Sequence, residues 1–542
     1  MQAAGFVLFA TLAVLMPALV VAWNEGAIAP FWFLAGDAYL YLGIGEHSQG
    51  WVMSYDGTRP TNGFHPLWQL VVRLGSAISG GGLAAMALAA WGAILCTLGG
   101  TLALGAAIRR FTGSWALALL AVPGVYFLVI GQALGNLPVW AFFDGMEAGL
   151  AFLLAGLFFW LLAAPRPSMA ALGLVLGLLV LTRLDEIFVP AGIYFAVLAW
   201  PGKPLAQRLR DAALLVLPTA LMVLAYLGWS WATTGMLAPV SGAAKGEGAL
   251  LQNVWVTLAT FFAPIIDLRE GLTAYTADRD GLLGGAFRVV ELVVPALFAA
   301  IFLTIVLRRF RARPWAAVLA GLSGGVLMKA AYNLIAVNYW HQAPWYFAVA
   351  LALMTLGTAI LLAPALQRAT AQHAAAPAFL ALGLGTMTLL HASLWTQGLM
   401  TNPLPARDRD FWLARAGTEA AIRAAEPDPR VLEFGDGLLN FTFGFPVRHG
   451  FVFAGDARSL AALREGRLLT DAGADGYHLI SSYDYLRVPE GAEAWDSETI
   501  RAFLDRSFLD PRIKSELDRF DFAMVHVARP WGVPVIRLIP RR

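Results

Sequence analysis

The sequence predicts an α-helical polytopic membrane protein that ends in a small soluble α/β domain. Of its 542 residues, 58% are hydrophobic and only 14% are charged, and the mean hydropathy is +0.65. This composition is typical of integral membrane proteins. The charge is unevenly distributed, because more than half of the charged residues lie after position 400. We therefore expect a membrane region at residues 1–399 and a soluble domain, called the tail below, at residues 400–542.

Apolar runs and basic clusters together predict the path of the chain through the membrane. A spanning helix needs about 20 apolar residues, and Lys and Arg gather on the cytoplasmic side. Runs of sufficient length lie near residues 5–23, 83–108, 115–134, 140–163, 211–231, 285–307, 315–337, 346–366 and 375–397. Basic clusters, which we expect in the cytoplasm, lie at Arg109-Arg110, Arg166, Lys203 with Arg208 and Arg210, Arg308 with Arg309, Arg311 and Arg313, and Arg368.

Two shorter apolar runs, 168–182 and 187–200, bring the expected number of transmembrane helices to about eleven. Basic residues flank this pair on both sides, so both flanks are predicted to be cytoplasmic. The pair must then enter the membrane and return, with residues 183–186 at the outer tip. The same reasoning places the amino terminus inside and the tail outside.

The run 66–79 is predicted not to cross the membrane, because a crossing there would place Arg109-Arg110 outside. We expect a juxtamembrane helix on the outer face that begins at Pro66, since proline is favoured in the first turn of a helix. The run 251–266 is interpreted in the same way.

The tail reads as a small α/β domain. Residues 408–425 have helical character, and residues 430–434, followed by Gly-Asp-Gly, read as a strand and a turn. Residues 523–528 and 533–538 have the alternating pattern of strands. No catalytic motif occurs in the tail, and the chain has no phosphate-binding loop, dinucleotide fingerprint or HExxH motif. The single Cys96 excludes a disulfide framework. A net charge of +2 gives no indication of nucleic-acid binding.

The predicted topology places every unusual polar cluster on the outer face. A charge at depth in the bilayer costs roughly 2.5–3.5 kcal/mol, so clusters gathered on one side indicate a shared cavity. These clusters are residues 24–65, Asp144–Glu147, Arg183–Glu186, Ser241–Lys245 and Asn338–Tyr346.

The first of these clusters carries a family resemblance. The sequence Asp37-Ala38-Tyr39-Leu40-Tyr41, followed by Thr-Asn-Gly-Phe-His-Pro-Leu-Trp at residues 61–68, resembles the first outer loop of GT-C glycosyltransferases that use polyprenyl-phosphate sugars. It looks most like the bacterial branch related to terminal arabinofuranosyltransferases, and more distantly like protein O-mannosyltransferases. Further similar segments are Gly145–Glu147, Thr182–Asp185, Pro239–Lys245, Tyr339–His341 and Trp345-Tyr346.

The resemblance implies a GT-C fold and transfer of a sugar from a lipid phosphate to an acceptor hydroxyl. Such a transfer needs a carboxylate that accepts the hydroxyl proton. Many relatives carry two acidic residues in tandem at the start of the loop, whereas here Gly36 precedes Asp37. The resemblance therefore places the base on Asp37 alone. The alternative role of Asp37 is that of a helix N-cap at a membrane exit.

The departing phosphate needs positive charge around it. Lys245, in a loop of Gly, Ala and Ser, and Arg183, at the tip of the short hairpin, are the candidate cations. Arg183 and Asp185 alternatively pair with one another. Tyr41 lies four residues after Asp37, on the same helical face, and is expected to line the sugar pocket.

The remaining candidates have competing explanations. For His65 the candidate roles are metal ligand, phosphate contact and helix cap. Glu147 is expected either to bind a ligand or to interact favourably with the dipole at the N-terminus of an apolar helix. Two roles are open for the next group: contact with the sugar or the phosphate, or membership of an aromatic belt at the membrane interface. The group consists of His341, Gln342 and Tyr346. We also place Asn62 and Asp185 among the substrate-binding residues. The resemblance alone implies a divalent cation (Mg, Mn or Ca) held by Asp37, His65 and Glu147.

The sequence therefore predicts an inverting glycosyltransferase that works on the periplasmic face of a bacterial inner membrane. Its expected partners are a polyprenyl-phosphate-sugar donor, a glycan, lipid or protein acceptor, and the membrane, without nucleic acid. A polytopic transporter or flippase of a lipid-linked or polar solute is the alternative. Transporters commonly have two related halves, with charged residues inside the membrane helices of both. This sequence shows no such pair of charged halves and no inverted repeat, which disfavours the transporter alternative.

Overall fold

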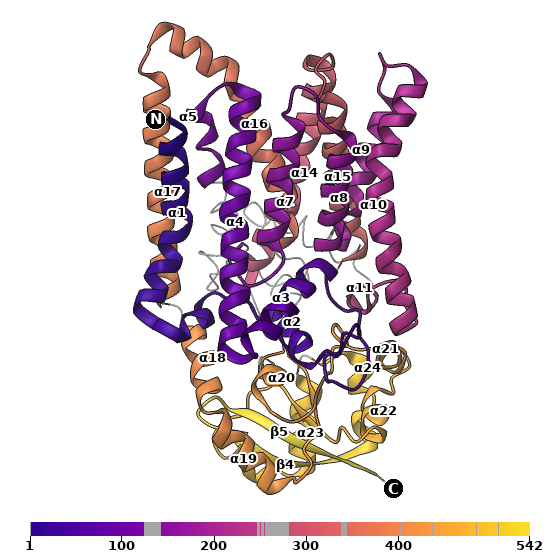
Figure 1. Ribbon diagram of the computed structural model, residues 1–542. Helices are drawn as coiled ribbons and strands as arrows, with labels where there is room; N and C mark the ends of the chain where they lie inside the picture. Colours follow the sequence, from indigo (N-terminus) through magenta and orange to yellow (C-terminus); the bar gives the residue numbers. More distant parts are fainter. Residues whose placement is uncertain are drawn as a thin grey trace.

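The computed structural model describes residues 2–123, 142–245, 250, 254, 281–337, 344–401, 403–435, 437–483, 485–507 and 509–541. A bundle of helices makes up one end of the molecule, and a smaller part that contains a sheet makes up the other (Figure 1). The N-terminus lies at the end of the bundle that is far from the sheet (Figure 1).

The described helices of the bundle follow the predicted apolar runs. They are α1 (Gln2–Glu25), α4 (Gly82–Thr112), α5 (Trp115–Ala118), α7 (Ala148–Leu162), α8 (Met169–Thr182), α9 (Phe188–Ala199), α10 (Leu205–Thr234), α14 (Gly281–Arg309), α15 (Ala316–Ala336), α16 (Ala348–Gln372) and α17 (Ala376–Thr401). Shorter elements connect them: η1 (Gly26–Trp32), α2 (Gly36–His47), α3 (Pro66–Ser79), η2 (Leu184–Ile187), α11 (Val240–Lys245) and η4 (Pro344–Phe347).

Among the residues that the structure describes, six helical segments are long and apolar enough to cross a membrane, by length and composition: Gln2–Trp32, Gly82–Thr112, Leu205–Thr234, Ala316–Ala336, Trp345–Gln372 and Ala376–Thr401. The apolar helices α7 and α8 have 15 and 14 residues, or roughly 20 Å, which is less than the hydrocarbon thickness of about 30 Å. A polytopic helical membrane protein is thus confirmed. Fewer described helices reach full spanning length than the eleven that the sequence predicts. Most of the predicted run 115–134 lies outside the described residues.

The predicted hairpin and juxtamembrane helix are both present. Helices α8 and α9 are joined by η2, so the chain turns between Thr182 and Phe188. Helix α3 begins at Pro66, and Figure 1 places α2 and α3 between the bundle and the tail. Of the run 251–266, only Val254 is described.

The basic clusters lie at the end of the bundle away from the tail. Helix α4 starts beside α2, where the Gly82 N–H donates to the Glu46 carboxylate at 2.7 Å, and it ends with Arg109 and Arg110 in its last turn. The start of α10, the turn between α14 and α15 and the end of α16 lie at the same far end in Figure 1. This arrangement agrees with the prediction that the basic clusters all lie on one side of the membrane, opposite the tail.

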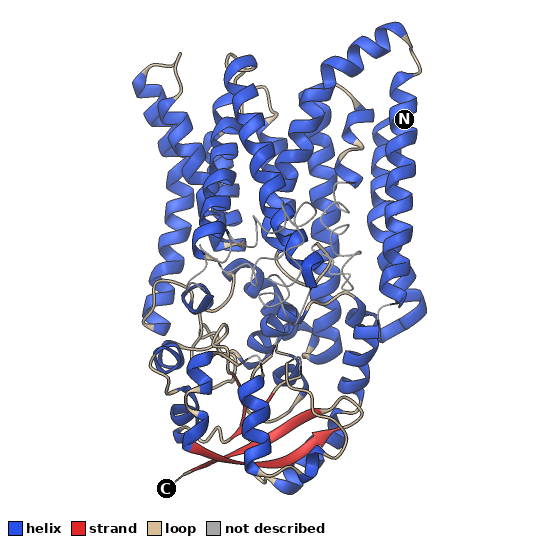
Figure 2. Ribbon diagram, turned by 180° about the vertical axis from the view of Figure 1, so that it is seen from behind, coloured by secondary structure: helices blue, strands red, loops and turns tan. Residues whose placement is uncertain are grey.

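The tail contains a five-stranded sheet, shown in red in Figure 2, with the order β2-β1-β3-β5-β4. Strand β1 pairs in parallel with β2 and β3, and β5 pairs antiparallel with β3 and β4. The strands are β1 (Val431–Glu433), β2 (Val447–His449), β3 (Leu479–Ser481), β4 (Phe520–Ala528) and β5 (Val533–Pro540). The helices are α18 (Pro403–Leu413), α19 (Arg415–Ala425), α20 (Leu438–Thr442), α21 (Ala457–Arg464), α22 (Leu468–Ala474), α23 (Ser497–Arg506) and α24 (Pro511–Lys514), with η5 (Ala492–Ala494) and η6 (Leu517–Arg519). The α/β character of the tail is confirmed.

The tail holds the first loop, residues 48–65, through buried charges. The Asp56 carboxylate accepts from Arg448 Nε and from the Tyr477 hydroxyl, each at 3.0 Å. Burial opposes the charged form of Asp56, but hydrogen bonds from Thr58 and the charge of Arg448 outweigh it and lower the Asp56 pKa. Because both partners are at least nine-tenths buried, this pair fixes the loop to the sheet.

Other contacts strengthen this junction. The Tyr55 hydroxyl donates to the buried Glu433 carboxylate at 3.0 Å. At Gly63 the loop comes so close to the tail that a Cβ there would overlap the carbonyl oxygen of Phe453. The tail therefore positions the segment that leads into His65 and α3.

Candidate active site

Asp37 lies in the first turn of α2, and its side chain is half-buried. The N-cap of this helix is Ala35, so the alternative that Asp37 is the N-cap is wrong. An acidic residue in the first turn still interacts favourably with the helix dipole. The Ala35 N–H donates to the carbonyl oxygen of Asp144 at 3.0 Å, which ties the start of α2 to the segment before α7. Asp37 and Asp144 lie close enough for their charges to interact.

Tyr41, one turn after Asp37, links α2 to the start of α7. Its hydroxyl donates to Glu147 Oε2 at 2.9 Å, and both side chains are buried. Burial and the neighbouring Glu147 charge raise the Tyr41 pKa well above its ordinary value, so the hydroxyl stays a donor. Gln69 of α3 donates to the Tyr41 carbonyl oxygen at 3.0 Å. The face of α2 that carries Asp37 is therefore held in place from two sides.

Arg183 is the centre of a buried ion-pair network. Its guanidinium pairs with Glu147 Oε1 and forms a two-pronged interaction with Asp185, at 3.1 Å from Nε and 3.2 Å from Nη2. It also stacks on the ring of Tyr346, 4.2 Å from the ring centre. The residue is only 1% exposed. The pairing of Arg183 with Asp185 is thus confirmed, and Glu147 is a second partner.

This environment differs from that of a free phosphate ligand. Arg183 spends its donors on two carboxylates of the protein, which leaves it little capacity for a substrate anion. Burial raises the Asp185 pKa, but the charges of Arg183 and Lys329 more than compensate and hold it well below the ordinary value. The described contacts show that Arg183, Asp185 and Glu147 hold one another in place; direct phosphate binding by Arg183 stays a prediction.

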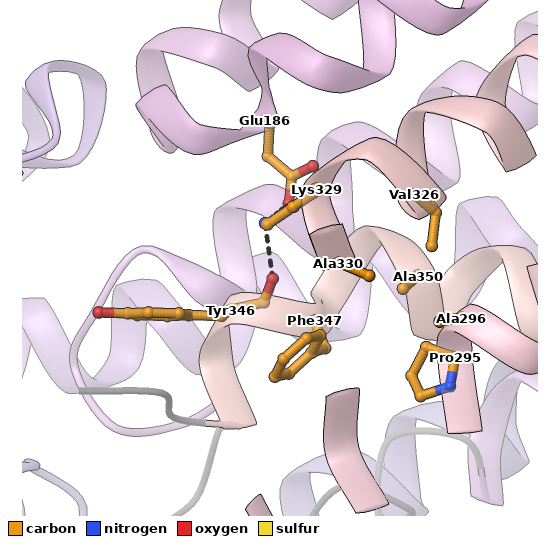
Figure 3. A pocket seen from close by; sticks show the side chains of 9 residues that line it. All are labelled: Glu186, Pro295, Ala296, Val326, Lys329, Ala330, Tyr346, Phe347 and Ala350. Carbon is orange, nitrogen blue, oxygen red and sulfur yellow. Dashed lines mark hydrogen bonds and ion pairs between the residues drawn. The ribbon is translucent and has the colours of Figure 1, made fainter. Parts of the chain in front are cut away.

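Lys329 of α15 is part of the site, although it is not among the residues predicted from the sequence. Its ammonium group pairs with Glu186 and donates to the Tyr346 carbonyl oxygen at 2.7 Å (Figure 3). The same group lies 3.0 Å from Asp185 Oδ2. A cavity of about 10 Å³ lies beside it, about the space of one water molecule. The available signal was a lone lysine inside the apolar run 315–337, because buried charges in spanning helices are costly and are kept for a reason.

His65 connects the first loop to the hairpin tip. Its Nδ1 accepts from the Leu184 N–H at 3.3 Å, and its Nε2 lies 3.7 Å from Glu147 Oε1. His65 is the N-cap residue of α3, but its side chain makes no capping hydrogen bond. Three segments that are distant in the sequence, at residues 65, 147 and 183, thus meet at one point.

Asn62, predicted as a substrate contact, makes structural hydrogen bonds in this arrangement. It is 1% exposed, and its amide donates to Ser230 Oγ at 2.8 Å and to the Ala238 carbonyl oxygen at 3.0 Å. Its Oδ1 accepts from the Val240 N–H at 2.9 Å. With both donors and the acceptor occupied by protein, Asn62 fixes the start of α11, the helix that ends at Lys245.

Three predicted residues cannot be placed as side chains. The backbone of Lys245 lies in α11, but its side chain is outside the described part of the chain. His341 and Gln342 lie outside the described residues altogether.

The residues proposed as metal ligands do not fit a cation in this arrangement. Glu147 accepts from Arg183 at Oε1 and from Tyr41 at Oε2, so a metal would have to share these oxygens with both donors and lie beside the positive charge of Arg183. Within the residues that the structure describes, no group of three or more His, Cys, Asp or Glu side chains is arranged to hold a metal. The predicted site of Asp37, His65 and Glu147 is therefore not supported.

The comparisons with known proteins yield only remote likenesses. No protein-family model matches the chain, and no curated protein matches it in sequence. The chain is similar to the oligosaccharyltransferase of Archaeoglobus fulgidus, in complex with Zn and sulfate, at 16% identity and a TM-score of 0.48, over 95% of this chain and 71% of that one.

A second likeness is to ArnT from Cupriavidus metallidurans. The apo state gives 15% identity and a TM-score of 0.49, over 99% of this chain and 98% of that one. The form bound to undecaprenyl phosphate gives 15% identity and a TM-score of 0.43, over 96% and 98%. Because all of these TM-scores are below 0.5, we base neither family nor function on them.

Proposed function

We propose that the chain is an inverting glycosyltransferase that moves a sugar from a polyprenyl phosphate to an acceptor hydroxyl. The supporting observation is the convergence of the Asp37 helix with His65, Glu147 and the Arg183 hairpin at the tail end of the membrane helices. This location suits a reaction between a lipid-anchored donor and a water-soluble or membrane-bound acceptor. The motif resemblance described above points to the same reaction.

In this proposal Asp37 is the general base. It is a half-buried carboxylate on a helix face that is fixed through Tyr41, and it accepts the proton of the acceptor hydroxyl as that oxygen attacks the sugar. One direct displacement at the anomeric carbon inverts its configuration. The leaving phosphate has a second pKa of roughly 6, so it departs as an anion without a general acid.

The buried network has a positioning role in this proposal. Arg183 holds Glu147, and Glu147 accepts from Tyr41 one turn from the base. Lys245 is the proposed phosphate cation, on a helix whose start is fixed by Asn62. A preorganised cation stabilises the charge that grows on the phosphate in the transition state. His341, Gln342 and Tyr346 remain proposed contacts for the sugar or the phosphate.

The proposed location is a bacterial inner membrane with the tail in the periplasm. Reporter fusions after residues 110, 203 and 311 are expected to report the cytoplasm, and fusions after residues 60, 245, 342 and 450 the periplasm. The physical reason is the retention of basic clusters on the cytoplasmic side. A periplasmic signal at residue 203 would contradict the membrane hairpin of α8 and α9.

The reaction is tested with the purified full chain in proteoliposomes that contain a short-chain polyprenyl-phosphate sugar. We expect free polyprenyl phosphate and glycosylated acceptor to appear in equal amounts, and only when an extract that supplies the acceptor is present. Lipid mass spectrometry and labelled sugar measure the two products. A donor lipid that crosses the bilayer chemically unchanged would instead identify a flippase, and the proposal would be wrong.

A further inference from the structure

A cleft with a cavity volume of about 570 Å³ opens between α9, α14 and α15. This volume is in the range of ordinary ligand sites. Its walls and floor are apolar: Phe195 and Ala199 come from α9, Leu303 and Leu307 from α14, and Gly324 and Met328 from α15. Arg311, in the turn between α14 and α15, lies at its rim. The cleft is therefore an apolar groove with a cation at one end.

Glycines on α15 explain why the groove exists. Helix α9 packs so closely on α15 that a Cβ on Gly192 would overlap the carbonyl oxygen of Gly321. One turn further, a Cβ on Gly324 would meet no atom within 4 Å, so this position faces open space. From Ala320 to Met328 the floor runs along roughly 12 Å of helix. The groove is thus a built feature of the helix packing.

The walls of the groove are open on the lipid side of the bundle. Phe195 is 62% exposed and Leu307 is 46% exposed, although both lie on helices of the membrane region. A lipid chain can enter such a groove sideways without leaving an apolar environment.

The rim of the groove carries unbalanced positive charge. Arg311 is exposed, and Arg308, Arg309 and Arg313 surround it in the sequence. Among the residues that the structure describes, no carboxylate forms an ion pair with any of these four arginines. Basic clusters at the membrane surface attract anionic lipids. The complementary ligand is a molecule with a negative head and an apolar chain.

We propose that this groove binds one anionic phospholipid of the leaflet opposite the tail. One acyl chain lies between α9 and α14 over Gly324, and the phosphate contacts Arg311. The Arg311 end of the groove lies at the end of the bundle away from the tail (Figure 1), and the floor runs along α15 as far as Met328, next to Lys329 in the sequence. None of the residues that line the groove belongs to the ion-pair network around Arg183. The proposal does not depend on the proposed function.

Native mass spectrometry of the full chain in detergent tests the charge requirement. Phosphatidylglycerol and phosphatidylethanolamine with identical acyl chains are titrated separately, and bound lipids are counted from the mass. We expect one phosphatidylglycerol to bind about tenfold more tightly than phosphatidylethanolamine, which is the discrimination that a charge-assisted hydrogen bond supplies. Arg311→Gln should remove most of this difference, whereas Arg309→Gln, which removes the same charge outside the groove, should change affinity less than about twofold.

A second pair of variants tests the apolar groove. Gly324→Leu fills the open space without a backbone clash and should weaken binding of both lipids about tenfold, since apolar burial is lost. Gly383→Leu is the matched control, because a Cβ there also meets no atom within 4 Å but lies on α17. Melting temperatures of both variants should stay near that of the wild type.

Several results would overturn the proposal. These are equal binding of the two lipids, equal effects of the two arginine variants, or equal effects of the two leucine variants. A dimer mass that disappears in Gly324→Leu would show that a second copy of the chain occupies the groove. Displacement of phosphatidylglycerol by a polyprenyl phosphate of equal charge, at a lower concentration, would assign the groove to the donor lipid instead.

Discussion

Asp37→Asn is expected to lower the rate of sugar transfer at least about 10²-fold, the contribution typical of a general base. Asparagine keeps the size and hydrogen bonding of the side chain, but it cannot accept the hydroxyl proton at neutral pH. Affinity for the donor should stay close to that of the wild type, because the phosphate and lipid contacts are unchanged. Steady-state rates and donor binding are measured on the same purified preparation.

Asp410→Asn is the matched control for this change. Asp410 is an exposed carboxylate on α18, on the same side of the bundle, and its replacement should leave turnover unchanged. Wild-type turnover in Asp37→Asn would remove Asp37 from the mechanism. An equal loss in both variants would indicate a general effect of negative charge on that face.

Arg183→Ala should have the largest effect on stability among single changes at the site. The substitution removes the permanent positive charge next to Glu147, which keeps only His65 nearby, and leaves Lys329 as the ion-pair partner of Asp185. Breaking a buried pair by removing one partner typically costs about 3–5 kcal/mol, because an uncompensated charge remains buried. Arg166→Ala, at an exposed arginine between α7 and α8, should cost almost nothing. Thermal unfolding of the two variants in the same detergent provides the measurement.

The same variant distinguishes positioning from phosphate binding. If Arg183 only holds Glu147, activity per folded molecule should fall less in Arg183→Ala than in Lys245→Ala, for which we expect a loss of roughly 10- to 100-fold. Glu147→Gln in the Arg183→Ala background should restore part of the stability, because it removes the unpaired charge. If the two cations share one phosphate, both single variants lose similar activity, and the double variant loses less than the product. That outcome would contradict our assignment of Arg183.

The helical framework was largely predictable because membrane helices are dictated by local apolar runs. The hairpin around Arg183 followed from a topological constraint, since basic residues on both flanks had to stay on one side. Helix α3 likewise followed from the position of Arg109 and Arg110. The lengths of the helices were less predictable. For example, residues 142–147 form a turn at the start of the predicted run 140–163, so helix α7 begins only at Ala148.

The contacts inside the site were not predictable from the sequence alone. Tyr41 and Glu147 are 106 residues apart, and Glu147 and Arg183 are 36 apart, so no local pattern pairs them. Asn62 has the side chain of a substrate ligand, but the approach of α10 and α11 turns it into a structural link. Only the tertiary arrangement decides between such roles.

The tail shows the same limit. Its strands were predictable where an alternating pattern is long, as in β4 and β5. The three-residue strands β1, β2 and β3 are buried throughout. Of these, the sequence predicts only β1, from residues 430–434, and the parallel pairing of β1 with β2 and β3 depends on distant segments. The role of the first loop in anchoring the tail, through Asp56 and Arg448, likewise required the structure.

A structure of the full chain with a short-chain polyprenyl-phosphate sugar tests the central claim most directly. The account predicts that the sugar lies beside Asp37, with the anomeric carbon open to attack from the side of that carboxylate. The phosphate should lie near the end of α11, within reach of Lys245, and the lipid should leave the site between membrane helices. A donor lipid bound away from Asp37, with no part of the sugar near α2, would contradict the account.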